Sequence, residues 1–164
     1  MNGALRDLFE VPQRPGTVQW IGLRPARRAT PFQPAEVNAI VGRGLEGDRY
    51  DNAGGARQVT LIQAEHVAAV AAFLGRESLA PERLRRNLLV SGINLLALKD
   101  RRFRVGEALL EWSGLCHPCS RMEEVLGPGG YNAMRGHGGI TARVIGAGRI
   151  AIGSTLVPEP ADAG

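Results

Sequence analysis

The sequence lacks the features that place a protein in a membrane or on an export route. None of its apolar runs approaches the roughly 20 residues that span a bilayer. Its first residues lack the basic flank and apolar core of a signal peptide. We therefore expect a cytoplasmic protein that makes no contact with a membrane.

Cysteine and histidine are also scarce. The 164 residues include two cysteines and three histidines. In an intracellular chain, two cysteines are more typical of a reactive or metal-binding site than of a structural disulfide. A structural zinc site would need two ligands beyond the cysteines, and the histidines show no paired spacing. The sequence thus disfavours zinc and directs attention to the cysteines themselves.

Lysine is almost absent, because Lys99 is the only one and the other basic residues are arginine. Basic residues outnumber acidic ones by 20 to 16, but they are scattered and are not interleaved with aromatic residues, so we expect no nucleic-acid partner. The arginine-rich stretches 24–28 and 83–86 are either solvated faces or parts of a pocket for a small anion. Arginine suits the second role because its planar guanidinium matches phosphate and carboxylate groups.

Glycine, by contrast, is abundant at 22 residues, so the chain turns often. Short apolar or alternating segments between the turns predict seven strands. They cover 17–23, 37–41, 58–62, 88–90, 103–112, 140–145 and 149–157. Apolar residues at helical spacing from Val67 to Leu74 predict an amphipathic helix that ends at Gly75, and 81–85 predicts one further turn. We expect a mainly β domain, closed into a β-barrel over 17–157, with an N-terminal extension at 1–16 and a flexible tail at 158–164.

Both cysteines fall in one short segment, Gly114-Leu115-Cys116-His117-Pro118-Cys119-Ser120. Ser120 and Glu123 have the spacing of a capping box and predict a short helix that ends at Gly127. The positive end of that helix would stabilise a thiolate at Cys119, which can attack an electrophile, carry a persulfide or ligate a soft metal. Cys116 receives no chemical role, because the helix end does not point at it.

Two other interpretations of the cysteines remain open. One is a thioredoxin-like dithiol, for which the predicted helix is too short and the surroundings too rich in strands. The other is that Cys119 is a small buried hydrophobe, as free cysteine often is.

Two glycine-rich loops and two strand mouths carry the remaining candidate residues. The loop 42–47 has the G-x-G-x-x-G pattern of a dinucleotide-binding loop, but it runs into a second turn at 51–55 instead of a helix, so only an anion-binding role remains. Arg57 and Arg86 each stand at the mouth of an apolar strand, where a barrel would gather them around one opening. Several arginines near one reactive cysteine would form a site for a phosphate-bearing cofactor. His137, in the second loop, is either an acid–base group or a bystander.

Six segments, taken in order, resemble the MOSC domain, the module similar to the C-terminal part of molybdenum-cofactor sulfurases. They are GLEGDRY, RQVTL, RRNLLVSGIN, RFRVGEALLEWSG, CHPCSRMEEVLGPGG and GHGGITARVIGAGRIAIGSTLV. The resemblance covers about residues 17–157 and implies a β-barrel of the pyruvate-kinase barrel type. It also implies a standalone domain of bacterial type without the desulfurase part. Pyridoxal phosphate therefore belongs to the family association only and is not expected on this chain, whose Lys99 lies in a polar turn.

The resemblance also implies roles for particular residues. In similar families a single cysteine carries sulfur or ligates molybdenum, and it matches Cys119. The residues that match the family's cofactor-binding positions, expected to hold the molybdenum cofactor by its pterin phosphate, are Arg57, Arg86, Asn87, Asp48 and Arg49. Tyr50 stands where relatives commonly have histidine, and Cys116 has no dependable counterpart.

Three functions fit these residues. As a sulfur carrier, Cys119 would accept persulfide sulfur from a separate cysteine desulfurase and pass it on for metal–sulfur assembly. As a molybdenum-dependent reductase, the chain would reduce N-hydroxylated compounds with electrons from a partner protein, because it has no flavin or iron–sulfur motif of its own. As a non-catalytic module, the barrel mouth would only capture an anionic ligand.

Overall fold

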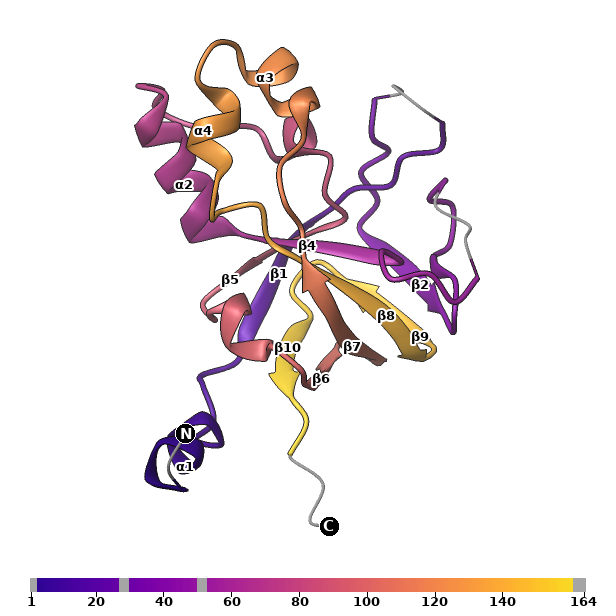
Figure 1. Ribbon diagram of the computed structural model, residues 1–164. Helices are drawn as coiled ribbons and strands as arrows, with labels where there is room; N and C mark the ends of the chain where they lie inside the picture. The colour runs from indigo at the N-terminus through magenta and orange to yellow at the C-terminus, as the bar shows by residue number, and fades with distance from the viewer. Residues whose placement is uncertain (1–2, 27–29, 50–52, 161–164) are drawn as a thin grey trace.

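Seven strands close into a barrel in the computed structural model, which describes residues 3–26, 30–49 and 53–160 (Figure 1). They are β1 (Gly16–Ile21), β4 (Val59–Gln63), β5 (Leu88–Ser91), β6 (Arg102–Val105), β7 (Ala108–Leu115), β8 (Ile140–Gly146) and β10 (Thr155–Pro158). Around the barrel they follow the order β1-β10-β6-β7-β8-β4-β5. Neighbouring strands are antiparallel except β4 and β5, which run parallel. The predicted mainly β fold with a closed barrel is confirmed.

A small second sheet lies beside the barrel. It has the order β3-β2-β9 and is formed by β2 (Glu36–Ile40), β3 (Gly44–Leu45) and β9 (Gly148–Ala151). Only Ala147 separates β8 of the barrel from β9 of the second sheet. This short connection and the shared apolar core, which includes Val37 and Ile150, hold the two sheets together.

The barrel is filled by apolar side chains because strand residues alternate between inside and outside. In β6, Phe103 is fully buried while its neighbours Arg102 and Arg104 are exposed. β4 differs, since all five of its residues are buried. Leu61 belongs to the barrel core, whereas Ile62 belongs to a second apolar cluster under the helices. One strand thus serves two cores.

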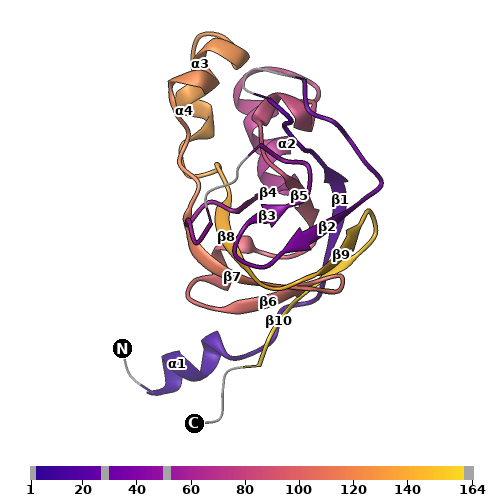
Figure 2. The same cartoon turned by 90° about the vertical axis from the view of Figure 1, so that its right-hand side faces the viewer.

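The helices that share this second cluster cover one end of the barrel. They are α2 (Ala64–Phe73), the 3-10 turn η1 (Pro81–Leu84), α3 (Ser120–Leu126) and α4 (Gly130–Met134). Figures 1 and 2 show α2, α3 and α4 together above the strands, while α1 (Gly3–Phe9) lies at the opposite end near the last strand. A further turn, η2 (Leu95–Leu98), precedes β6. Among the described residues, each helix is too short or too polar to cross a bilayer.

The helix predicted from Val67 to Leu74 is confirmed as α2, followed by Gly75 in a left-handed conformation with φ 68°. The turn predicted at 81–85 is confirmed as η1. No pattern in the sequence predicts α1, and none of its residues is buried. Packing therefore does not explain why α1 forms.

Two of the predicted strands are wrong in extent, because each is divided by a turn. The segment 103–112 holds β6 and β7, which form a hairpin through Gly106, where φ is 57°. The segment 149–157 holds β9 and β10, separated by Gly153 with φ 93°. Both glycines adopt conformations that side chains disfavour, which is why the chain turns there.

The predicted capping box is also wrong. Cys119, not Ser120, is the N-cap residue of α3, and its side chain makes no capping hydrogen bond. Glu123 instead accepts hydrogen bonds from the backbone N–H groups of Gly129 and Tyr131, at 2.8 and 2.9 Å. These two bonds lower the pKa of the Glu123 carboxyl. Glu123 therefore ties α3 to α4 and does not close the first turn of α3.

Candidate functional site

One end of the barrel gathers the loops of four strands. β1 ends and β5 begins where Ile21 pairs with Leu88. β7 ends and β8 begins where Leu115 pairs with Ile140. In β4, Leu61 pairs with both Leu88 and Ile140 and so brings the two places together. The segments after β1 and β7 and before β5 and β8 therefore meet, at the end that carries α3 (Figure 1).

Arg86, just before β5, has an unused donor at this end. Its side chain is buried, with 6% of the residue exposed. Its Nε donates to the Gly138 carbonyl at 2.8 Å and its Nη1 donates to the Leu84 carbonyl at 2.8 Å. Its Nη2 is buried and has no hydrogen-bond partner among the described residues. A buried charged donor without a partner costs free energy, so this atom is suited to an anionic ligand.

The two cysteines lie beside Arg86 and differ in exposure. Cys116 is 1% exposed, and Nη2 of Arg57 donates to its Sγ at 3.6 Å. Cys119 is exposed, and both cysteines are free thiols. Burial lowers the pKa of Arg86, and attraction to Cys116 and Cys119 opposes that shift. The interpretation of Cys119 as a buried hydrophobe does not hold, because the buried residue is Cys116.

Further arginines converge on the same end from separate parts of the chain. Burial lowers the pKa of Arg24, a shift that Asp48 opposes and three nearby arginines increase. Burial also lowers the pKa of Arg85, which interacts with Cys119. The guanidiniums coupled in this way are those of Arg24, Arg49, Arg57, Arg85, Arg86 and Arg121. Arginine stays protonated at neutral pH, and Asp48 beside Arg24 and Glu124 paired with Arg121 balance only part of this charge, so this end of the barrel is positive.

The two arginine-rich stretches of the sequence contribute unequally. From the second, Arg85 and Arg86 belong to the coupled group, whereas Arg83 is exposed and donates to the Val125 carbonyl of α3 at 2.6 Å. From the stretch 24–28, Arg24 belongs to the coupled group, whereas Arg27 and Arg28 lie outside the described residues. Tyr50 also lies outside the described residues.

Asp48 and Arg49 lie against Arg24. The backbone N–H of Arg24 donates to Asp48 Oδ1 at 2.7 Å, and the backbone N–H of Arg49 donates to the Arg24 carbonyl at 2.7 Å. Asp48 Oδ2 and Arg24 Nε are buried and have no partner among the described residues. The site thus has an unused acceptor and a second unused donor.

Asn87 has a different environment. Its Oδ1 accepts from the backbone N–H and hydroxyl of Thr60, at 3.0 and 3.2 Å, and its Nδ2 donates to the Gly22 carbonyl at 3.0 Å. These bonds fix the start of β5 against β4 and β1, so Asn87 positions the adjacent Arg86. The cofactor contact that the sequence suggests for Asn87 stays a prediction.

The histidines form no contact with the two thiols among the interactions of the described residues. His137 lies edge-on to His66 of α2, with ring centroids 4.8 Å apart, and its Nδ1 is buried without a partner among the described residues. His117 is exposed. The described part of the chain holds no group of three or more histidine, cysteine or acidic residues placed to bind a metal. A metal held by Cys119 would therefore need ligands beyond the part of the chain that the structure describes.

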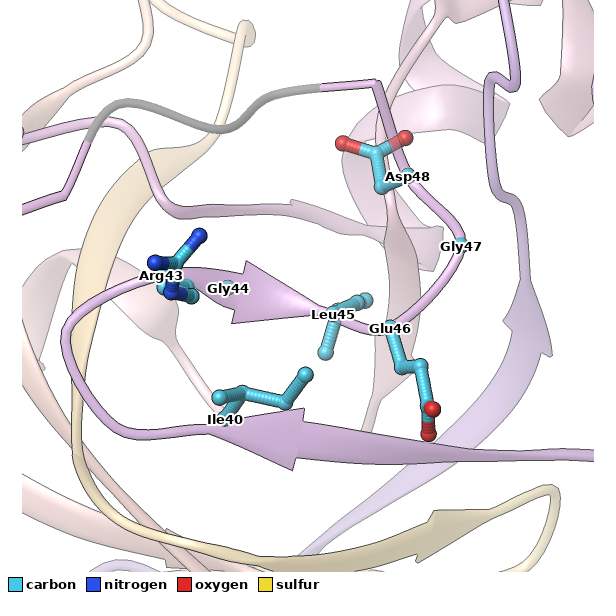
Figure 3. A pocket seen from close by; sticks show the side chains of 7 residues that line it. All are labelled: Ile40, Arg43, Gly44, Leu45, Glu46, Gly47 and Asp48. Atoms are coloured by element: carbon cyan, nitrogen blue, oxygen red, sulfur yellow. The ribbon is translucent and has the colours of Figure 1, made fainter.

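The loop with the G-x-G-x-x-G pattern forms a separate feature. Gly42 lies in the turn between β2 and β3, Gly44 begins β3 and Gly47 follows it, and no helix begins in this loop. The hairpin borders a hollow of about 220 Å³, shown in Figure 3. Its lining residues are Ile40, Arg43, Gly44, Leu45, Glu46, Gly47 and Asp48. Asp48 belongs to both the hollow and the contact with Arg24, so it links the two.

The sequence missed Cys116 as a site residue. Its contact with Arg57 joins positions 59 residues apart, which no local pattern reveals. The one available signal was the Cys-x-x-Cys spacing with Cys119.

Comparison with known proteins agrees with this architecture. The family model of the MOSC domain matches residues 48–157. The solved structure of the YuaD protein from Bacillus subtilis has a TM-score of 0.80 at 20% identity and covers 92% of this chain and 98% of that chain. YiiM from Geobacillus stearothermophilus has a TM-score of 0.69 at 20% identity, covering 92% of this chain and 78% of its own. YiiM from Escherichia coli has a TM-score of 0.67 at 21% identity, and the match covers 90% of this chain and 72% of that chain. No curated protein matches the sequence.

Proposed function

The chain belongs to the MOSC domain family, which is associated with the molybdenum cofactor, and from that premise we propose that its arginine-rich barrel end binds this cofactor by the phosphate. The observation that carries the proposal is the buried, unpartnered Nη2 of Arg86. A phosphate oxygen there would satisfy the donor and neutralise part of the surrounding positive charge.

The residues present fit such a cofactor. Arg86 and Arg57 offer donors to its phosphate, and Arg24 and Asp48 add an unused donor and acceptor at the same end. Cys119 offers the soft thiolate that molybdenum accepts. When bound, the cofactor supplies a metal that can change its oxidation state and its sulfur or oxygen ligands.

For Cys119 we favour the role of sulfur carrier. It is exposed, so the active site of a separate cysteine desulfurase can reach it, and its thiol can hold the transferred sulfur as a persulfide. The alternative is a molybdenum-dependent reductase of N-hydroxylated compounds served by an electron-transfer protein. Both roles use the same thiol and the same cofactor site.

Metal and pterin content per chain tests cofactor binding. The protein is purified anaerobically from a host that makes the cofactor, as wild type and as Cys119→Ser, Arg86→Ala and Arg83→Ala. Arg83→Ala is the matched control, because Arg83 is exposed and donates to α3. We expect near-stoichiometric pterin in wild type, in the control and in Cys119→Ser, and at least about tenfold less pterin in Arg86→Ala. Loss of molybdenum in Cys119→Ser would instead favour the reductase, in which Cys119 holds the metal. A folded wild type without pterin, or unchanged pterin in Arg86→Ala, would overturn the proposal.

A further inference from the structure

The end of β7 contacts the segment before β4 at two places. The Ser113 hydroxyl donates to the Ala56 carbonyl, and Nη2 of Arg57 donates to Sγ of Cys116 at 3.6 Å. We propose that Cys116, assisted by Ser113, is a positioning residue that fixes the guanidinium of Arg57 for binding of the phosphate. This inference rests on the proposed role of Arg57 as a donor to the cofactor phosphate.

Cys116 is itself held in place. Its backbone N–H donates to the Gly139 carbonyl at 2.9 Å, and a Cβ atom on Gly138 would collide with its carbonyl oxygen. The loop before β8 thus packs directly on the backbone of Cys116, and only 1% of this residue is exposed. The sulfur is therefore a fixed acceptor, shielded from water, for the donor on Arg57.

β7 departs from regular pairing at Ser113. Its register against β8 shifts between Trp112 and Gly114. Such bulges are frequent next to functional sites, where they change the direction of a side chain. Here the bulge coincides with the hydrogen bond from the Ser113 hydroxyl to Ala56, the residue before Arg57. The end of β7 therefore holds the backbone next to Arg57 as well as its guanidinium.

Charge repulsion acts against this position of Arg57. Burial lowers the pKa of Arg86 and the nearby charge of Arg57 lowers it further, whereas Cys116 opposes both effects. The two guanidiniums therefore repel each other, and the hydrogen bond to the sulfur holds Arg57 beside Arg86. An arginine side chain loses conformational entropy when a ligand orders it. Orientation of Arg57 before the anion arrives therefore strengthens binding.

The test is the affinity for inorganic pyrophosphate, a probe for the phosphate, measured by isothermal titration calorimetry. The variants are Cys116→Val, Cys116→Ala, Cys116→Ser, Ser113→Ala and Arg57→Ala, with Cys116→Val and Ser113→Ala each repeated in the Arg57→Ala background. Val105→Ala is the matched control, because Val105 is fully buried at the β6–β7 hairpin, the opposite end of β7 from Cys116. Circular dichroism checks that each variant is folded, and Ser113→Ala tests the inference without a change in the buried cysteine.

Cys116→Val and Cys116→Ala should weaken pyrophosphate binding by about three- to tenfold. Cys116→Ser and Ser113→Ala should weaken it less, because the serine hydroxyl can still accept the bond and Ser113 holds only the backbone. In the Arg57→Ala background, neither Cys116→Val nor Ser113→Ala should weaken binding further.

Val105→Ala should bind as tightly as wild type although it melts at a lower temperature. Wild-type affinity in the folded Cys116 and Ser113 variants, or losses that simply add to that of Arg57→Ala, would overturn this inference and leave the phosphate site intact. Wild type that binds no pyrophosphate would overturn both.

Discussion

At the residue scale, the two thiols of the site differ most in their access to solvent. Cys119 is exposed and Cys116 is 1% exposed, so we expect iodoacetamide to alkylate Cys119 at least about tenfold faster at neutral pH. Peptide mass spectrometry of a time course measures both rates. In denaturant, where burial is lost, the two rates should converge. Equal, slow labelling of both cysteines in the folded protein would contradict this prediction.

For single residues, the sequence predicts position in the fold but not hydrogen-bond partners. Arg86 could be predicted because an arginine at the mouth of an apolar strand is a local pattern. Its unused Nη2 could not, since that depends on carbonyl groups of Gly138 and Leu84 that occupy its other donors. The positioning role of Asn87 could not be predicted either, because its hydrogen bonds to Thr60 and Gly22 exist only once the barrel has closed.

At the element scale, the helices near the site are fixed by contacts between elements. α3 has seven residues and no side-chain cap, and Glu123 ties it to α4 through two backbone N–H groups. The sequence places Glu123 correctly for a capping box, but the N–H groups it binds follow the helix and do not begin it. The Ser-x-x-Glu pattern shows that Glu123 has the spacing of a capping residue. Which N–H groups its carboxylate binds depends on how the chain turns after Gly127.

The loop before β8 connects α2 to Arg86 and carries one member of a histidine pair. His137 in this loop contacts His66 of α2, and the next residue, Gly138, accepts the hydrogen bond from Arg86. Burial and the charge of His137 lower the pKa of His66, while Glu65 opposes the shift. The unfolded chain therefore takes up a proton at His66 more readily than the folded one, and stability falls as the pH drops below the usual histidine pKa.

Replacement of His66 should reduce this loss. Between about pH 7.5 and about pH 5.5, we expect the melting temperature of His66→Gln to fall less than that of wild type, by about 1–2 °C. His117→Gln is the matched control, because His117 is exposed and lies outside this contact. Thermal melts followed by circular dichroism measure the difference. An identical pH response in His66→Gln and wild type would rule out a contribution from this pair.

At the scale of the whole molecule, the fold concentrates charge that the sequence spreads. The formal net charge is only +4, and basic residues look scattered along the chain. The barrel nevertheless brings six arginines, from Arg24 to Arg121, into one electrostatically coupled group. Strand count and glycine content suffice to predict the barrel, but the gathering of charge depends on strand order, which local patterns do not contain.

Such a group repels itself, so an anion bound to the folded state should stabilise the whole molecule. Inorganic pyrophosphate, as a probe for the phosphate end of the cofactor, should raise the melting temperature by about 5–10 °C at a concentration 100-fold above its Kd. Sodium chloride at equal ionic strength controls for screening of the arginines. The increase should persist in Arg83→Gln and disappear in Arg86→Gln, because Arg86 has a buried donor without a partner among the described residues, whereas Arg83 is exposed and already donates to the Val125 carbonyl. An equal increase with chloride would mean that the arginines respond to ionic strength alone and form no phosphate site.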